Sequence, residues 1–67
     1  MKNPARIIVN TRSNDVTVIW ITHSIYVYQV MRFYGESLND SMKRAEHYCG
    51  YLNGMYETNP DFTPIGI

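Results

Sequence analysis

Apolar and β-branched residues gather in three short segments in the first half of the chain: Arg6 to Thr11, Val16 to Ile21 and Ile25 to Tyr34. β-branched and aromatic side chains favour extended backbone, so each segment predicts a strand. The polar residues between them, 12–15 and 22–24, are typical of tight turns. The pattern therefore predicts a three-stranded antiparallel meander. Its middle strand is apolar on both faces, as a central strand should be.

The third segment also supports a second interpretation. Val27, Val30, Met31 and Tyr34 would form one stripe of a helix, and periodicity alone does not decide the type of a short apolar run. Its β-branched and aromatic residues favour the strand. As a strand, it directs alternate side chains to opposite faces of the sheet. One set is Ile25, Val27, Met31 and Phe33, and the other is Tyr26, Tyr28, Val30 and Tyr34.

A helical period begins after Ser37. Ser37 is a good N-cap, and Asp40 stands three residues on, as in a capping box. Asp40 and Arg44 are four apart with the acid first, which favours an ion pair. Gly54 is a plausible residue just beyond the C-terminus, so the helix is predicted to end near Asn53. One face of this helix is apolar: Leu38, Met42, Ala45, Cys49, Leu52 and Tyr56.

These elements predict an α+β fold of order β-β-β-α, with the meander packed against one helix. Residues 1–56 would form a single small domain and residues 57–67 an irregular tail, because Asn59-Pro60 and Thr63-Pro64 interrupt any period. Whether Trp20 faces the helix or the opposite side stays open. The predicted core comprises Ile7, Val9, Ile19, Ile21, Ile25, Val27, Met31, Phe33, Leu38, Met42, Ala45, Cys49 and Leu52.

The charge balance, the length of the apolar stretches and the cysteine count limit the kinds of partner and the compartment that we expect. Six basic and six acidic side chains cancel and form no runs, which argues against a nucleic-acid backbone as the main partner. No stretch reaches the ~20 apolar residues of a membrane-spanning helix, and no signal peptide is visible. Cys49 is the single cysteine, so no intrachain disulfide can form. That pattern favours a reducing compartment, and we expect a cytoplasmic protein.

No constellation of residues predicts catalysis or metal binding. His47 and Cys49 are two apart on the helix and point about 200° apart, so they cannot share a metal ion. Cys49 with His23 is the one candidate pair of nucleophile and base, and a buried thiol in apolar surroundings is inert. No glycine-rich phosphate loop is present. We therefore expect no enzymatic activity, no cofactor and no metal.

A single helix can cover one face of the sheet, which leaves a tyrosine-rich face for a partner. Tyrosine and tryptophan are enriched at interface hot spots. The predicted partner-binding residues are Trp20, Tyr26, Tyr28, Val30, Arg32 and Tyr34. Small non-catalytic chains are often modulators or inhibitors of larger proteins, and phage-encoded inhibitors of host enzymes are one such class.

Two alternatives account for the same residues. Tyr26, Tyr28 and Tyr34 with Arg32 would suit a platform on which single-stranded nucleic acid stacks. The tyrosines would equally suit a homodimer interface, because small cores often need oligomerisation.

Overall fold

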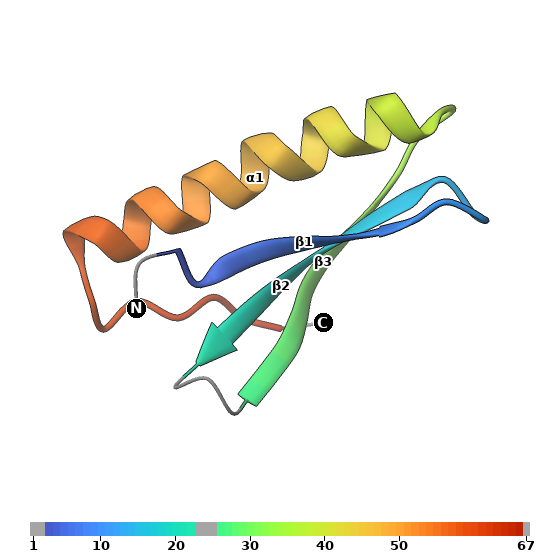
Figure 1. Ribbon diagram of the computed structural model, residues 1–67. Helices are drawn as coiled ribbons and strands as arrows, with labels where there is room; N and C mark the ends of the chain where they lie inside the picture. The colour runs from blue at the N-terminus through green and yellow to red at the C-terminus, as the bar shows by residue number, and fades with distance from the viewer. Residues whose placement is uncertain (1–2, 23–25, 67) are drawn as a thin grey trace.

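The chain forms an antiparallel sheet of three strands, in the order β1-β2-β3, with one helix packed across one face (Figure 1). The computed structural model describes residues 3–22 and 26–66. The elements are β1 (Ala5–Asn10), β2 (Asp15–Thr22), β3 (Tyr26–Tyr34) and α1 (Leu38–Thr58). The predicted β-β-β-α fold is confirmed, and the ambiguous third segment is a strand. Of the predicted turn at residues 22–24, Thr22 is instead the last residue of β2; residues 23–24 and the predicted core residue Ile25 lie outside the described residues.

Local side chains build the loop between β1 and β2. Asn14 has a φ of 55°, in the left-handed region that asparagine adopts more readily than most residues. The backbone N–H of Arg12 donates to Oδ1 of Asn10 at 3.1 Å. Ser13 Oγ donates to Oδ2 of Asp15 at 2.9 Å. The loop is therefore stabilised by the same residue types that predict it.

A β-bulge in β3 changes which side chains share a face. Val18 pairs with Met31, whereas the next residue of β2, Ile19, pairs with Gln29. Val30 is thus an extra residue in β3, and the alternation of side chains shifts by one position beyond it. Tyr28 and Phe33 consequently lie on the same face of the sheet. Tyr28 pairs with Trp20 of β2, and Phe33 pairs with Val16.

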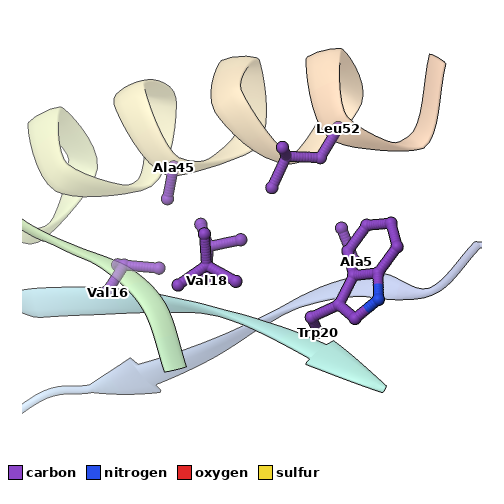
Figure 2. Close-up of a cluster of buried hydrophobic side chains, with 7 residues drawn as sticks. Ala5, Val16, Val18, Trp20, Ala45 and Leu52 are labelled. Carbon is purple, nitrogen blue, oxygen red and sulfur yellow. The ribbon is translucent and has the colours of Figure 1, made fainter. Parts of the chain in front are cut away.

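The core lies between α1 and the face of β2 that carries Val16, Val18 and Trp20 (Figure 2). Ile19 and Ile21, which the predicted core includes, therefore lie on the other face of β2, although Ile19 is itself buried. Both faces of β2 are apolar, so alternation alone could not choose between them. The bulky Trp20 is 1% exposed, beneath the end of α1. The buried cluster comprises Ala5, Val16, Val18, Trp20, Val30, Ala45 and Leu52.

Other core predictions divide into two groups. Three are wrong because the side chains are exposed: Val9 by 41%, Val27 by 55% and Met31 by 38%. Val27 is on the face away from the helix, and the bulge places Val30 in the core while Met31 stays exposed. The predicted residues that are buried in the cluster or packed against it are Ile7, Phe33, Leu38, Met42, Ala45, Cys49 and Leu52.

The helix begins as predicted and ends later. Ser37 Oγ accepts a hydrogen bond from the N–H of Asp40 at 3.2 Å, which confirms the N-cap. The predicted Asp40–Arg44 ion pair is present at 3.6 Å. The predicted end near Asn53 is wrong, because α1 continues through Gly54 to Thr58. The packing of Tyr56 against Trp20 extends the apolar face by one turn and offsets the ~1 kcal/mol that a helical glycine costs.

The segment after α1 folds back onto the helix side of the sheet. The ring of Phe62 meets that of Trp20 edge-on, with centroids 5.9 Å apart. Tyr28 donates its hydroxyl hydrogen to the carbonyl oxygen of Pro64 at 2.7 Å. The helix and this segment together cover the face of the sheet that carries Trp20 and Tyr28.

Candidate functional site

The residues predicted to bind a partner do not form one surface. Trp20 and Val30 are 1% and 2% exposed and belong to the core. Tyr28 is half-buried on the same side and bonds to Pro64. These three residues contribute to the helix-side layer, so they are not available as a docking surface.

The remaining predicted site residues lie on two faces. Tyr26 is 69% exposed at the start of β3. Arg32 and Tyr34 lie on the face of the sheet away from α1. Arg32 pairs with Thr17 of β2, and Tyr34 pairs with Asp15. The prediction that Tyr26, Tyr28, Val30 and Tyr34 share one face is therefore wrong, and the bulge at Val30 is the physical reason.

The sheet has a face that no helix or strand of the described chain covers, and we call it the open face (Figure 1). Its exposed apolar groups are Ile8 at 54%, Val27 at 55% and Tyr34 at 60%. The central residues Thr17 and Ile19 are only 7% and 9% exposed. Thr17 lies between Ile8 and Arg32 on the flanking strands, and Ile19 lies between Arg6 and Gln29. By the pairing of the strands, the open face comprises Arg6, Ile8, Asn10, Asp15, Thr17, Ile19, Ile21, Val27, Gln29, Arg32 and Tyr34.

Arg32 and Tyr34 are joined on the open face. Arg32 Nη1 donates to the hydroxyl oxygen of Tyr34 at 3.1 Å. This hydrogen bond raises the pKa of Arg32 above its already high ordinary value, and the charge of the nearby Asp15 acts in the same direction. Arg32 therefore stays a cation, and its guanidinium and the phenol of Tyr34 present an aromatic and cationic pair to solvent.

The net charge is zero, but basic and acidic side chains are unevenly distributed along the chain. Residues 1–34 contain four basic side chains and one acidic side chain, and residues 35–67 contain two basic and five acidic ones. Residues 1–34, which include the three strands, thus carry +3, from four minus one. The helix and the segments around it carry −3, from two minus five. Among the side chains of the open face, Arg6 and Arg32 are basic, and the acidic Asp15 is only 6% exposed.

The edge strand β1 is partly closed by a helix side chain. Asn53 Oδ1 accepts from the N–H of Ala5 at 2.9 Å, and Asn53 Nδ2 donates to the carbonyl oxygen of Ala5 at 3.2 Å. Cys49 Sγ donates to the same carbonyl at 3.1 Å. The amide of Asn53 thereby takes the place that an adjacent strand would occupy beside Ala5.

A hollow of about 420 Å³ opens between α1 and the end of β3. Its apolar wall is made by Phe33 and Tyr48, whose ring centroids are 5.7 Å apart. Lys43, Arg44 and His47 complete the lining, and Arg44 is also paired with Asp40 at 3.6 Å. The sequence pattern does not predict this hollow. The spacing of Lys43 and His47 places them on one side of the helix, but only the tertiary structure brings Phe33 beside them.

Cys49 has an environment that lowers its reactivity. Burial raises the pKa of its thiol, while the charge of Arg6 and a hydrogen bond from Asn53 act in the opposite direction. The other predicted member of a nucleophile–base pair, His23, lies outside the described residues. Within residues 3–22 and 26–66, no three potential ligands among histidine, cysteine, aspartate and glutamate are grouped to hold a metal ion.

Comparisons with known proteins assign neither a family nor a function to the chain. No protein-family model matches the sequence, and no curated protein or solved structure gives a significant match. The described part of the chain contains no helix that is long and apolar enough to span a membrane.

Proposed function

We propose that this chain is a small non-enzymatic binding protein that docks onto a larger protein through the open face of its sheet. The observation that carries the proposal is the lack of a second layer on this face in the described chain, although Ile8, Val27 and Tyr34 are each more than half exposed there. Interfaces combine such apolar and aromatic anchors with a polar rim, and arginine is enriched at their hot spots. Occlusion of a functional surface on the partner would make the chain a modulator or inhibitor.

Charge favours a different protein as the partner over a second copy. A face-to-face homodimer would bring two open faces together, each with Arg6 and Arg32 and with Asp15 largely buried. Unlike this arrangement, a partner with acidic groups around an apolar centre would complement both arginines. The single, half-buried Cys49 supports the proposal that this interaction takes place in a reducing compartment, the cytoplasm.

The test begins with capture of partners from the source cells by the tagged protein, followed by identification and purification of the captured protein. Binding is then measured directly for the wild-type chain and for Val27→Glu and Ile8→Glu. Both side chains are exposed, so the fold should persist and binding should weaken at least tenfold. A matched control, Met55→Glu, places a charge on a partly exposed residue of the helix. Equal weakening by Met55→Glu, or full binding by Val27→Glu, would show that the open face is not the docking surface.

A second candidate function is the binding of single-stranded nucleic acid, and the uneven charge distribution favours it. The strands carry Arg6 and Arg32, the β1–β2 loop carries Arg12, and Tyr34 lies beside Arg32 as a stacking group. Base–aromatic stacking next to cations is how sequence-tolerant single-strand binders work. Titration with labelled oligonucleotides at low and high salt separates the two functions. A nucleic-acid complex weakens steeply as salt rises, and a flat titration at low salt excludes this candidate.

A further inference from the structure

The two edges of the sheet differ in what they offer to an added strand. The N–H of Ile21 donates to the carbonyl of Pro4, which sets the alternation of hydrogen bonds in the β1–β2 ladder. Odd-numbered residues of β2 therefore bond to β1, and even-numbered residues bond to β3. Phe33, which pairs with Val16, turns its N–H and C=O toward β2.

The same alternation turns the N–H and C=O of Arg32 and Tyr34 outward, away from β2. In the described chain, no further strand pairs with β3. On β1, by contrast, both outward groups of Ala5 are bonded to Asn53. The end of β3 therefore offers an extended segment two residues, Arg32 and Tyr34, with which to form main-chain hydrogen bonds.

The hollow between β3 and α1 lies beside this edge. A residue added opposite Phe33 would direct its side chain to the helix side of the sheet, against Phe33 and Tyr48. Lys43 and His47 border the same space. The neighbours of that added residue would point to the open face, next to Arg32. An apolar residue at the centre and acidic residues around it would thus meet complementary groups on both faces.

We propose that the β3 edge and the hollow bind an extended acidic peptide segment of the partner protein by strand addition, with an apolar or aromatic side chain in the hollow. This mode combines main-chain hydrogen bonds with a side-chain pocket, as other strand-addition domains do. The inference rests on the proposed function and specifies the chemistry of the partner. A second copy is disfavoured as the occupant, because two β3 strands paired at their ends would bring the Arg32 side chains of both copies to the same stretch of the open face.

The probe is a fluorescein-labelled heptapeptide with a central phenylalanine, two glutamates on each side and a threonine at each end. Its affinity for the purified chain is measured by fluorescence anisotropy, and amide shifts are followed by NMR. We expect saturable binding with the largest shifts at Arg32, Phe33 and Tyr34. Lys43→Glu should weaken binding at least tenfold, whereas Arg12→Glu, the same charge change in the β1–β2 loop, should alter it less than twofold.

N-methylated peptides test the strand addition separately from charge. The glutamates next to the phenylalanine would direct their N–H groups to β3, so methylation of those two nitrogens should abolish binding. Methylation of the phenylalanine nitrogen, which would point away from β3, should leave most of the affinity. Equal binding of both peptides, or equal affinity for Lys43→Glu and wild type, would overturn the proposal.

The peptide titration and the binding of the purified partner by Val27→Glu together distinguish failure of the peptide site from failure of docking through the open face. Loss of partner binding in Val27→Glu, together with no peptide binding, would overturn the peptide site alone. If the chain binds the peptide and Val27→Glu leaves its affinity for the purified partner unchanged, docking through the open face is overturned instead. Shifts centred on Ile8 and Val27, or dimerisation of the chain in sedimentation without peptide binding, would also count against the peptide site.

Discussion

The side-chain amide of Asn53 exchanges two hydrogen bonds with the backbone of Ala5, at 2.9 and 3.2 Å. These residues are 48 positions apart, and the contact fixes the last third of α1 to the first residue of β1. It also satisfies the outward N–H of Ala5 and, together with Cys49 Sγ, its carbonyl oxygen. A helix side chain thus both joins the two layers and protects an edge of the sheet.

Asn53→Leu should therefore destabilise the fold. The substitution leaves the N–H of Ala5 without its Asn53 partner and the carbonyl oxygen with Cys49 alone, and a part-buried backbone group left without a partner costs about 1–3 kcal/mol. The free energy of unfolding from urea denaturation measures the effect. Asn39→Leu is the control, because Asn39 is exposed on the same helix and should change stability by less than ~0.5 kcal/mol. Equal effects of the two variants would contradict the role of Asn53.

The glycines of α1 offer a stabilising change. A Cβ added at Gly50 or Gly54 would meet no atom within 4 Å outside its own turn of helix. Because alanine is favoured over glycine in a helix interior, each Gly→Ala change should stabilise the protein by about 1 kcal/mol, seen as a higher urea midpoint. Gly35→Ala should do the opposite, since its Cβ would lie 2.5 Å from Asp40 Oδ2 and 3.0 Å from Ser41 Oγ.

The bulge predicts that two valines of β3 respond differently to the same change. Val30→Ser replaces a side chain that is 2% exposed and should cost at least ~2 kcal/mol of unfolding free energy, because it removes core packing and buries a hydroxyl. Val27→Ser alters a side chain that is 55% exposed and should cost under ~1 kcal/mol. Thermal and urea unfolding of both variants provide the comparison. The reverse order would place Val30 on a surface after all.

Stability should fall at alkaline pH. Burial raises the pKa of both the Cys49 thiol and the Tyr28 phenol. An acid with a raised pKa in the folded state binds its proton more tightly there than in the unfolded chain. Its contribution is complete below the unfolded pKa, about 8.5 for a thiol, and is lost as pH rises through the folded value. Urea midpoints from pH 7.5 to 10 should therefore decrease, and the decrease should be smaller in Cys49→Ala with Tyr28→Phe.

Fluorescence of the single tryptophan reports the packing of the segment after α1. Phe62 and Tyr56 both meet the Trp20 ring edge-on. Phe62→Ala should expose one side of the indole and shift its emission to longer wavelength, with a loss of a few kcal/mol in stability. Ile65→Ala is the matched control, because Ile65 is 91% exposed and should leave the spectrum unchanged. An unshifted spectrum in Phe62→Ala would mean that this segment does not cover Trp20 in solution.

The sequence by itself determined the type and order of the elements. β-branched runs favoured three strands, Ser37 with Asp40 began the helix, and the stripe that includes Ala45 and Leu52 identified its buried face. These features depend on local sterics and on side-chain spacing, which a linear sequence contains. Among the predicted site residues, the alternation of side chains along β3 placed Arg32 and Tyr34 on one face, and both are exposed there.

Only the tertiary structure decided which face of β2 the helix covers and where the bulge lies. Both faces of β2 are apolar, so the choice depended on the fit of Trp20 beneath Tyr56 and Phe62. One extra residue, Val30, then moved Arg32 to the opposite face from Tyr28. A one-residue shift reverses the facing of every later side chain in a strand, and its energy comes from packing between distant segments. For that reason the open face and the hollow beside β3 emerged from the fold and not from the sequence pattern.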